Sequence, residues 1–310
     1  MDSKDQNVNN MNGGNKGHLV DVACIVVHYR RFPQVLDAVS SLLTAGVDPS
    51  VLVVVDNSED QDISMELGKA LPRGSSLLLQ QNRGYAAAVN AGFEHLKSEN
   101  KVKPFTLVAT HDVSLFPDCV EKLRDVMCQD QRIAVSGPLL LTCRKDGSLI
   151  WSMGGGLRTI TKIPYTIEIC QKDFPPEIAS LEDACDVMWL DGAINLYRSD
   201  ILDEHPLCEQ FFLYYEETDE HVLLHSLGNR VVVALSAKGQ QSSQICPAFL
   251  HGRNLCFFLK KHNWSNRIPL ALIRMIVSYV TKIFRGRRTW RDFMLFLKGV
   301  EAGLFLKIDL

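Results

Sequence analysis

Short apolar segments alternate with segments of helical periodicity through the first half of the chain. Three runs of β-branched and other apolar residues, at 20–28, 51–55 and 105–110, have the length of buried strands. Residues 32–45 and 85–97 instead carry apolar side chains at helical spacing. Because strands that alternate with helices usually form a parallel sheet covered on both faces, the pattern predicts a three-layer α/β domain with a largely parallel sheet.

The same pattern continues less regularly through the middle of the chain. Further strands are expected at 76–80, 133–141, 187–197 (with an Asp-Gly break) and 230–235, further helices at 117–128 and 219–227, and loops at 152–157 and 172–176. Residues 268–284 and 290–306 are typical of amphipathic helices. They are expected either to form a buried helical cap or to lie in a membrane interface.

These elements divide the chain into a polar leader, a large α/β domain (the body) and a helical C-terminal region (the tail). Residues 1–18 are polar and lack the apolar core of a signal peptide, so they are expected to be a disordered leader. Residues 19–245 are expected to form the α/β domain, and residues 246–310 a basic, helical C-terminal region. No uninterrupted apolar run reaches the ~20 residues that span a bilayer.

Charge is distributed unevenly between the body and the tail. The 310-residue chain has a net charge of -3, yet from Cys246 onward 12 Lys and Arg face 3 Asp and Glu. Such a tail suits an anionic partner, such as a membrane surface, although a solvated helical surface shows the same excess. No nucleic acid partner is expected. The nine cysteines form no CxxC pair, which predicts reduced thiols in a cytoplasmic protein, with the tail at the inner face of the membrane.

Acidic side chains occur at two kinds of position that suit a ligand site: directly after predicted strands and directly after an aromatic run. Asp56 and Asp112 directly follow predicted strands, and ligands of such sheets collect at the carboxyl ends of strands. An aromatic run at 211–215 leads into four carboxylates within 216–220. This arrangement fits the wall of a cleft that meets a hydroxyl or a cation, or else the solvated first turn of a helix.

Seven short motifs in a fixed order carry a family resemblance. They are VHYRR (27–31), VVDNS (54–58), QNRGYAAAVNAG (81–92), THDV (110–113), WLDGA (189–193), FFLYYEETD (211–219) and RNLCFFLKKH (253–262). In these motifs the chain resembles the family-two inverting glycosyltransferases of the GT-A fold, especially the rhamnosyltransferase-like branch. The resemblance implies a GT-A α/β/α sandwich with a C-terminal helical appendage.

The resemblance also implies a donor site. Its members are His28, Asp56, Asn82, Arg83, Gly84, Asn90, Thr110, His111 and Arg253. Asp56 is implied to accept hydrogen bonds from the base or ribose, and Arg253 to contact the diphosphate. Each has a structural alternative: a turn for Asp56, a surface position for Arg83, a core edge for Asn90 and a salt bridge for Arg253.

For catalysis, the resemblance implies that Glu217 is the base that takes the acceptor's proton. Glu216 would share or orient that proton, and Asp191 is a second candidate base. Asp219 is expected to cap or steady the following helix.

Asp112 occupies the position of the family's metal-binding motif and is implied to hold Mg²⁺ or Mn²⁺. Thr110 replaces the usual first ligand, and residues 237–243 lack the His that many relatives carry. Lys238, Arg253 or the helix start near Gly84 would be the alternative partners of the diphosphate.

The resemblance therefore implies single-displacement transfer of a sugar from a dTDP- or UDP-sugar, with dTDP-L-rhamnose as the first candidate. The acceptor is a hydroxyl of a glycan, a lipid-linked glycan or a natural product. Two other hypotheses are a catalytically degenerate nucleotide-sugar-binding scaffold and a nucleotidyltransferase. The latter would need a Gly-rich phosphate loop near the first strand, where residues 28–33 contain no Gly.

Overall fold

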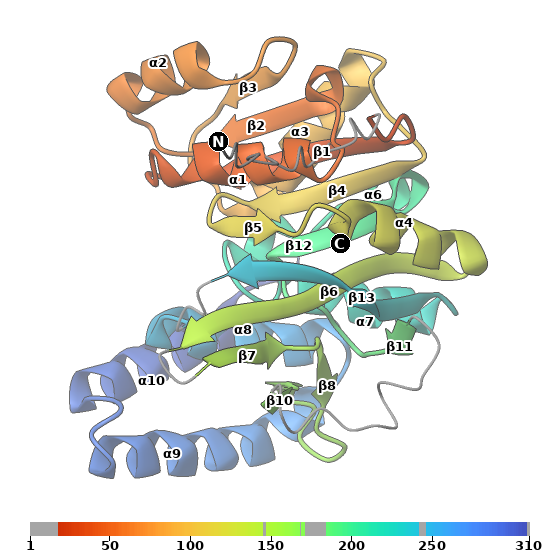
Figure 1. Ribbon diagram of the computed structural model, residues 1–310. Coiled ribbons are helices and arrows are strands. Elements are labelled where there is room, and N and C mark those ends of the chain that lie inside the picture. Colours follow the sequence, from red (N-terminus) through yellow and green to blue (C-terminus); the bar gives the residue numbers. More distant parts are fainter. Residues whose placement is uncertain (1–17, 145–146, 168, 171–183, 242–245, 309–310) are drawn as a thin grey trace, which may run out of the picture.

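The computed structural model describes residues 18–144, 147–167, 169–170, 184–241 and 246–308 (Figure 1). Its centre is a mixed sheet in which the strands follow the order β10-β7-β6-β12-β4-β1-β2-β3, with β13 beside β6 and paired to β5 and β11. These strands are β1 (Val22–His28), β2 (Leu52–Asp56), β3 (Ser76–Leu79), β4 (Phe105–Thr110), β5 (Val113–Leu115), β6 (Ile133–Arg144), β7 (Gly147–Ser152), β10 (Ile169–Cys170), β11 (Ala184–Asp186), β12 (Ile194–Arg198) and β13 (Arg230–Gln241). A separate ribbon pairs β8 (Gly155–Leu157) with β9 (Pro164–Thr166).

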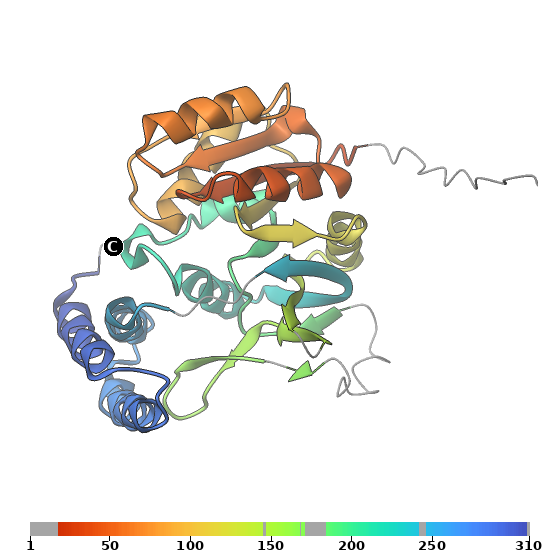
Figure 2. The same cartoon turned by 60° about the vertical axis from the view of Figure 1, so that its left-hand side comes forward.

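The helices lie on both faces of the sheet and at one end of it (Figures 1 and 2). They are α1 (Gln34–Thr44), α2 (Gln61–Ala70), α3 (Tyr85–Ser98), α4 (Cys119–Gln129), α6 (Ser199–Glu204), α7 (Glu216–Ser226), α8 (Ala248–Lys261), α9 (Ile268–Phe284) and α10 (Trp290–Phe305). Short 3-10 turns occur at Pro49–Val51, Glu209–Phe211 and Ser265–Arg267. The expected elements of the first half are confirmed, with ends shifted by at most three residues. The expected leader, apart from His18, and the loop at 172–176 lie outside the described residues.

Three expectations for the middle of the chain are wrong. The expected strand at 187–197 begins only at Ile194 and ends at Arg198, because the chain turns at the Asp-Gly pair and packs Trp189 into the interior. The expected strand at 230–235 continues to Gln241 because it follows β6 past an irregularity after Ala234. The expected loop at 152–157 includes β8, which finds a partner in β9.

The direction of the strands gathers the functional residues at one edge. The strands β1 to β4 are parallel to one another, and β12 is antiparallel to both β4 and β6. Therefore β6, and β13 parallel to it, run in the same direction as β1 and β4. The expectation of a largely parallel sheet holds for these main strands, although β12 interrupts them. Their carboxyl ends meet at one edge, where ligands of such sheets bind.

Alternate residues of each central strand enter different cores. In β1, Cys24 and Val26 join a cluster with α1 and α4, whereas Ala23 and Ile25 join a cluster with α3. Successive side chains point to opposite faces of the sheet, and helices cover both faces. The strands are therefore continuous apolar runs in the sequence. The result is the three-layer arrangement expected from the sequence.

The C-terminal helices form a third core. Cys256 and Phe257 of α8 pack with Met275 of α9 and Phe296 of α10. On α10, Gly299 lies so close to α8 that an added Cβ would be 2.0 Å from the Phe249 carbonyl oxygen. The expected helical cap is therefore present on one face of these helices. Within the described ranges, none of the helices combines the length and apolarity needed to cross a membrane.

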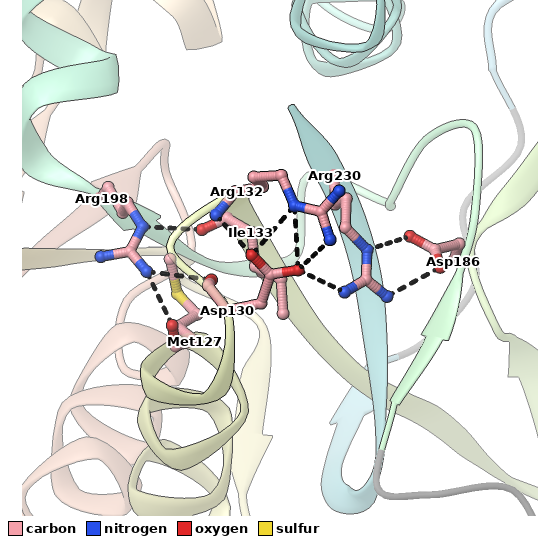
Figure 3. A network of polar contacts seen from close by, with 7 residues as sticks. All are labelled: Met127, Asp130, Arg132, Ile133, Asp186, Arg198 and Arg230. Atoms are coloured by element: carbon pink, nitrogen blue, oxygen red, sulfur yellow. Dashed lines mark hydrogen bonds and ion pairs between the residues drawn. The ribbon is translucent and has the colours of Figure 1, made fainter. Parts of the chain in front are cut away.

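An ionic network secures the opposite, amino-terminal edge of the sheet (Figure 3). Arg198, at the end of β12, donates to the carbonyl oxygens of Met127 (2.7 Å) and Ile133 (2.8 Å). Arg230 joins Asp130 (3.0 Å) to Asp186 (2.8 Å). These contacts join α4, β6, β11, β12 and β13 at the edge away from the candidate site.

Candidate active site

A buried carboxylate–imidazole pair ends strands β1 and β2. His28 Nδ1 lies 2.9 Å from Asp56 Oδ1, and the backbone N–H of Arg31 donates to His28 Nε2 at 3.1 Å. In neutral His28, Nε2 is thus the acceptor, so the proton lies on Nδ1 and is donated to Asp56. Asp56 also accepts from the Ser58 N–H (2.9 Å) and the Ser64 hydroxyl (2.8 Å).

These donors decide the ionisation of Asp56. Burial alone would raise its pKa, but hydrogen bonds from His28, Ser58 and Ser64 outweigh burial and hold the pKa at about 2. Only 2% of Asp56 is exposed. Asp56 therefore acts in this structure as an internal partner of His28, and its contact with a nucleotide base or ribose stays a prediction.

Beside this pair, a cleft of about 460 Å³ opens at the carboxyl edge of the sheet. Its volume lies in the range of small-ligand sites, about 300–1,000 Å³. The residues that line it are Arg31, Gln34, Asp37, His111, Asp112, Val113, Ser114, Leu141, Thr142, Gln240 and Gln241. The His111 ring meets the His28 ring edge-on, with 5.6 Å between centroids. Burial lowers the pKa of His111, so its imidazole is neutral near pH 7.

Asp112 is oriented within this cleft by two side chains. Its Oδ1 accepts from the Thr110 hydroxyl at 2.7 Å and from the Gln241 amide at 3.0 Å. Thr110, which departs from the family motif, therefore positions the carboxylate. Gln241 comes from the end of β13, the region in which the sequence lacks the family's His.

The metal ligands that the protein offers at this cleft fit a cation that is also held by substrate phosphates. The described residues contain no group of three His, Cys, Asp or Glu side chains arranged to hold a metal. Asp112 lines the cleft and is the carboxylate that the sequence singles out. Mg²⁺ commonly binds through one or two carboxylates, substrate phosphates and water, so Asp112 fits this mode.

A second group of acidic side chains lies at the start of α7. Glu216 is only 1% exposed, and its Oε2 is buried without a hydrogen-bond partner among the described residues. Burial, and then the charges of Glu216 and Asp191, raise the pKa of Glu217 well above its ordinary value. Burial, and then the charge of Asp219, likewise raise the pKa of Glu216. The two glutamates therefore hold protons more tightly than exposed ones.

The neighbours of Glu217 come from distant parts of the chain. The Tyr85 hydroxyl, at the start of α3, donates to the Gly192 carbonyl at 2.7 Å. A Cβ added to Gly192 would lie 3.5 Å from the carboxyl carbon of Glu217, so the loop after Asp191 passes directly beside that carboxylate. Burial, and then the charges of Cys246, Glu217, Glu216 and Asp112, raise the pKa of Tyr214 to about 12.

The loop before α7 has an unusual backbone that α8 holds. Phe212, Tyr214 and Tyr215 have positive φ angles of 67°, 67° and 79°, which side chains other than Gly rarely adopt. Asn254 is fully buried and donates to the Leu213 and Tyr214 carbonyls, both at 2.9 Å. The strained loop therefore depends on this amide for its shape.

Arg253 serves the same loop. Its guanidinium donates to the carbonyl oxygens of Gln210 and Phe211, the latter at 2.9 Å. The structure thus directs this side chain to backbone oxygens, and we omit Arg253 from the proposed diphosphate site. Asp219 pairs with Lys261 and His262 and so holds the first turn of α7 against the end of α8. Of the two expected roles, it therefore steadies the helix and does not cap it.

The motif around Gly84 is built into the scaffold. Gly84 has φ 101°, and a Cβ there would be 2.0 Å from the Phe212 carbonyl oxygen. That oxygen accepts the N–H of Tyr85 at 2.8 Å. The first N–H of α3, expected to face a diphosphate, is therefore used by the loop before α7. Asn82 forms a turn by accepting from the Gly84 N–H at 3.1 Å.

Two other expected donor residues lie on the scaffold as well. The Asn90 amide pairs with both backbone polar groups of Leu207, at 2.9 and 3.0 Å. Arg83 is exposed and lies 3.5 Å from Glu209. Both contacts match the structural alternatives considered for these residues.

The structure thus brings together two sets of expected residues. They are His28, Asp56, Thr110, His111 and Asp112 at the cleft, and Asp191, Glu216 and Glu217 at the start of α7. Sequence reasoning missed Arg31, Gln241 and Tyr85. Arg31 closes the VHYRR motif and Tyr85 begins a predicted helix, so both carried a signal. Gln241 is recognisable only from the pairing of β13.

Comparison with known proteins agrees with this geometry. The family model for glycosyl transferase family 2 matches residues 23–184, slightly more than half of the chain. The chain belongs to this family and is a glycosyltransferase. A search of curated proteins finds no match.

Two solved structures share the fold. GalNAc-T7 with UDP, GalNAc and Mn²⁺ has a TM-score of 0.58 at 10% identity, over 77% of this chain and 47% of that chain. The mannosyltransferase PcManGT from Pyrobaculum calidifontis, in complex with GDP-Man and Mn²⁺, has a TM-score of 0.54 at 12% identity, over 92% of this chain and 87% of that chain. This chain thus spans about half the length of the GalNAc-T7 chain. At these identities the likeness concerns the fold, which is GT-A.

Proposed function

We propose that the protein is an inverting glycosyltransferase that moves a sugar from a nucleotide-diphosphate donor to an acceptor hydroxyl in one displacement. The observation that carries this proposal is the place of Glu217 directly beside the loop at Asp191 and Gly192, where burial and the charges of Glu216 and Asp191 raise its pKa well above its ordinary value. A carboxylate that binds a proton tightly is a stronger general base than an exposed one. Such a group suits the removal of a hydroxyl proton during attack on the anomeric carbon.

Each side chain has a role in this reaction. Glu217 takes the acceptor's proton, an effect worth about 10²–10⁴-fold, while Glu216 and Asp191 keep its proton affinity high. Asp112 would hold Mg²⁺ or Mn²⁺, which would supply positive charge to the diphosphate leaving group. Arg31 lines the same cleft and offers a second positive charge to the diphosphate.

The donor is proposed to be dTDP-L-rhamnose, with UDP-sugars next. The resemblance to the rhamnosyltransferase-like branch supports the first. The UDP and GDP-Man in the two similar structures support a nucleotide-sugar donor in general. The acceptor would be a hydroxyl of a glycan, a lipid-linked glycan or a natural product, met in the cytoplasm.

Nucleotide binding and transfer test the proposal separately. Thermal shift with dTDP, UDP and GDP, each with and without Mn²⁺ or Mg²⁺, should show stabilisation by at least one diphosphate, because a ligand of the folded state raises Tm by mass action. Asp112→Asn should abolish the part of the shift that depends on the cation. Asp37→Asn, in the same cleft, is the matched control and should retain it.

Transfer is then measured with sugars linked to the nucleoside diphosphate that stabilises the protein most. The anomeric configuration of the product, followed by NMR, should be inverted. Retention of configuration would refute the single displacement, and no Tm shift with any nucleotide would refute the donor site.

A binding role without turnover is the second candidate function. The described residues contain no three-ligand metal group, and Thr110 stands at the position of a usual ligand. Clear nucleotide binding, together with no transfer or donor hydrolysis in the presence of either cation, would favour this candidate.

A further inference from the structure

The C-terminal helices bury one face and expose another that is unusually apolar. In α9, Ala271, Met275 and Tyr279 are buried against the third core. The opposite face of α9 and the exposed side of α10 carry large apolar residues in contact with solvent: Leu270, Ile273, Val277, Phe284, Trp290, Met294, Leu295, Leu304 and Phe305. Phe284 and Phe305 are each 81% exposed. We call this face, with the connecting residues 285–289, the hairpin surface.

The exposed residues of α9 form a continuous stripe. Leu270, Ile273 and Val277 are three and four residues apart, and Phe284 follows seven residues later, so all lie on one side of the helix. A second row, with Arg267, Arg274 and Arg285, runs beside this stripe. An apolar stripe bordered by cations is the pattern of helices that lie in a membrane interface.

The charge of the hairpin surface is almost entirely positive. The chain contains no Asp or Glu between Glu220 and Asp292. The exposed cations of this surface are Arg267, Arg274, Lys282, Arg285, Arg287, Arg291 and Lys298. The two acidic residues of α10, Asp292 and Glu301, offset only a part of this charge because they face seven exposed cations, and Asp292 also lies 3.9 Å from the half-buried Arg288.

The hairpin lies at the outer edge of the molecule. In Figures 1 and 2, α9 and α10 form the margin farthest from α2 and β3, and the turn between them projects outward. Phe284 and Trp290 flank this turn, which contains Arg285, Arg287 and Arg288. Aromatic and cationic side chains are thus presented together at a projecting tip.

We propose that the hairpin surface docks on an anionic lipid bilayer, with the apolar stripe at the boundary of headgroups and acyl chains and the arginines on the headgroups. Two features favour a bilayer over a protein partner. The apolar residues follow the length of a helix instead of forming one compact pocket. The flanking charge is predominantly positive along the whole surface, which suits a uniformly anionic plane.

Vesicle flotation of the full chain tests this proposal without reference to turnover. The protein should float with vesicles of phosphatidylcholine and phosphatidylserine and much less with pure phosphatidylcholine. Raising the salt from about 0.1 M to about 1 M shortens the screening length from about 10 Å to about 3 Å and should release most of the protein. Arg285→Glu with Arg287→Glu should weaken binding about 30-fold or more. Phe284→Ser with Trp290→Ser should weaken it about tenfold or more at low salt.

Matched variants at the far end of the molecule serve as controls. Met65→Ser with Leu79→Ser removes two apolar side chains that are 56% and 57% exposed, and Lys69→Glu with Arg73→Glu reverses two exposed charges. Both control proteins should float like the original.

Three results would overturn the proposal. The first is the absence of flotation with anionic vesicles at low salt, and the second is flotation that neither hairpin variant weakens. The third is a lipid-free dimer, detected by analytical ultracentrifugation, that Phe284→Ser with Trp290→Ser dissociates. This third result would assign the surface to another copy of the chain.

Discussion

Two buried acidic sites in this protein have opposite proton affinities. Asp56 is 2% exposed and Glu216 is 1% exposed, so burial disfavours the charge of both. Yet the pKa of Asp56 is held at about 2, whereas burial raises the pKa values of Glu216 and Glu217. Burial alone therefore does not decide ionisation at these sites.

The difference lies in what surrounds each carboxylate. Asp56 receives hydrogen bonds from His28, Ser58 and Ser64. Glu217 instead faces other carboxylates, and Glu216 leaves one oxygen without a partner among the described residues. Donors stabilise the ionised form and make Asp56 a structural anion, while burial, with neighbouring negative charges added to it, makes Glu217 a proton acceptor. The comparison separates the residue that shapes the site from the one proposed to react in it.

The sharpest test of the comparison is Glu217→Gln. The amide keeps the size of the side chain and cannot take a proton, so transfer should fall about 10²–10⁴-fold. Nucleotide binding measured by thermal shift should persist. Glu209→Gln, on the loop before α7, is the control and should transfer normally. Transfer by Glu217→Gln within a few-fold of the original would remove this residue from the role of base.

The second test concerns the contribution of ionised Asp56 to the free energy of unfolding. A folded pKa of about 2, below the usual 3.8, means that ionised Asp56 stabilises the fold. Asp56→Asn should lower the free energy of unfolding by about 2–3 kcal/mol at pH 7, as measured by urea denaturation. Because the folded pKa is depressed, this stabilisation is complete above about pH 4 and is lost as the pH falls through 2.

The difference in free energy of unfolding between Asp56→Asn and the original protein should therefore decrease as the pH is lowered. Exposed Asp37→Asn, as a control, should change stability by less than about 0.5 kcal/mol. A gap that stays constant from pH 7 down to pH 2 would contradict the assigned ionisation.

The third and smallest effect is a shift in pH dependence. A base must be ionised, so transfer should be lost as the pH falls through the raised pKa of Glu217. Glu216→Gln removes a neighbouring negative charge, lowers that pKa and should move the acid limb of kcat/KM to lower pH by about one unit. Glu220→Gln, one turn further along α7, should leave the limb in place. A limb that moves to higher pH in Glu216→Gln would show that the two glutamates do not repel each other.

Parts of the site were predictable because they depend on local pattern. Asp56 and Asp112 follow apolar runs that could only be buried strands, and parallel strands bring their carboxyl ends to one edge. The roles of Asn90 and Arg253 were not predictable. Their partners, Leu207 and the carbonyls of Gln210 and Phe211, lie 117 and about 40 residues away, at distances over which sequence pattern carries no information about contact.

The sequence by itself determined the layered α/β architecture, the GT-A resemblance and the two faces of α9, because hydrophobic period and motif order are local properties of the chain. Only the tertiary structure decided which carboxylates are reactive. Asp56 and Glu217 are both acidic residues beside apolar runs, and the fold alone supplies donors to one and negative neighbours to the other. Proton affinity depends on groups within a few ångströms, and in this protein those groups come from segments far apart along the chain.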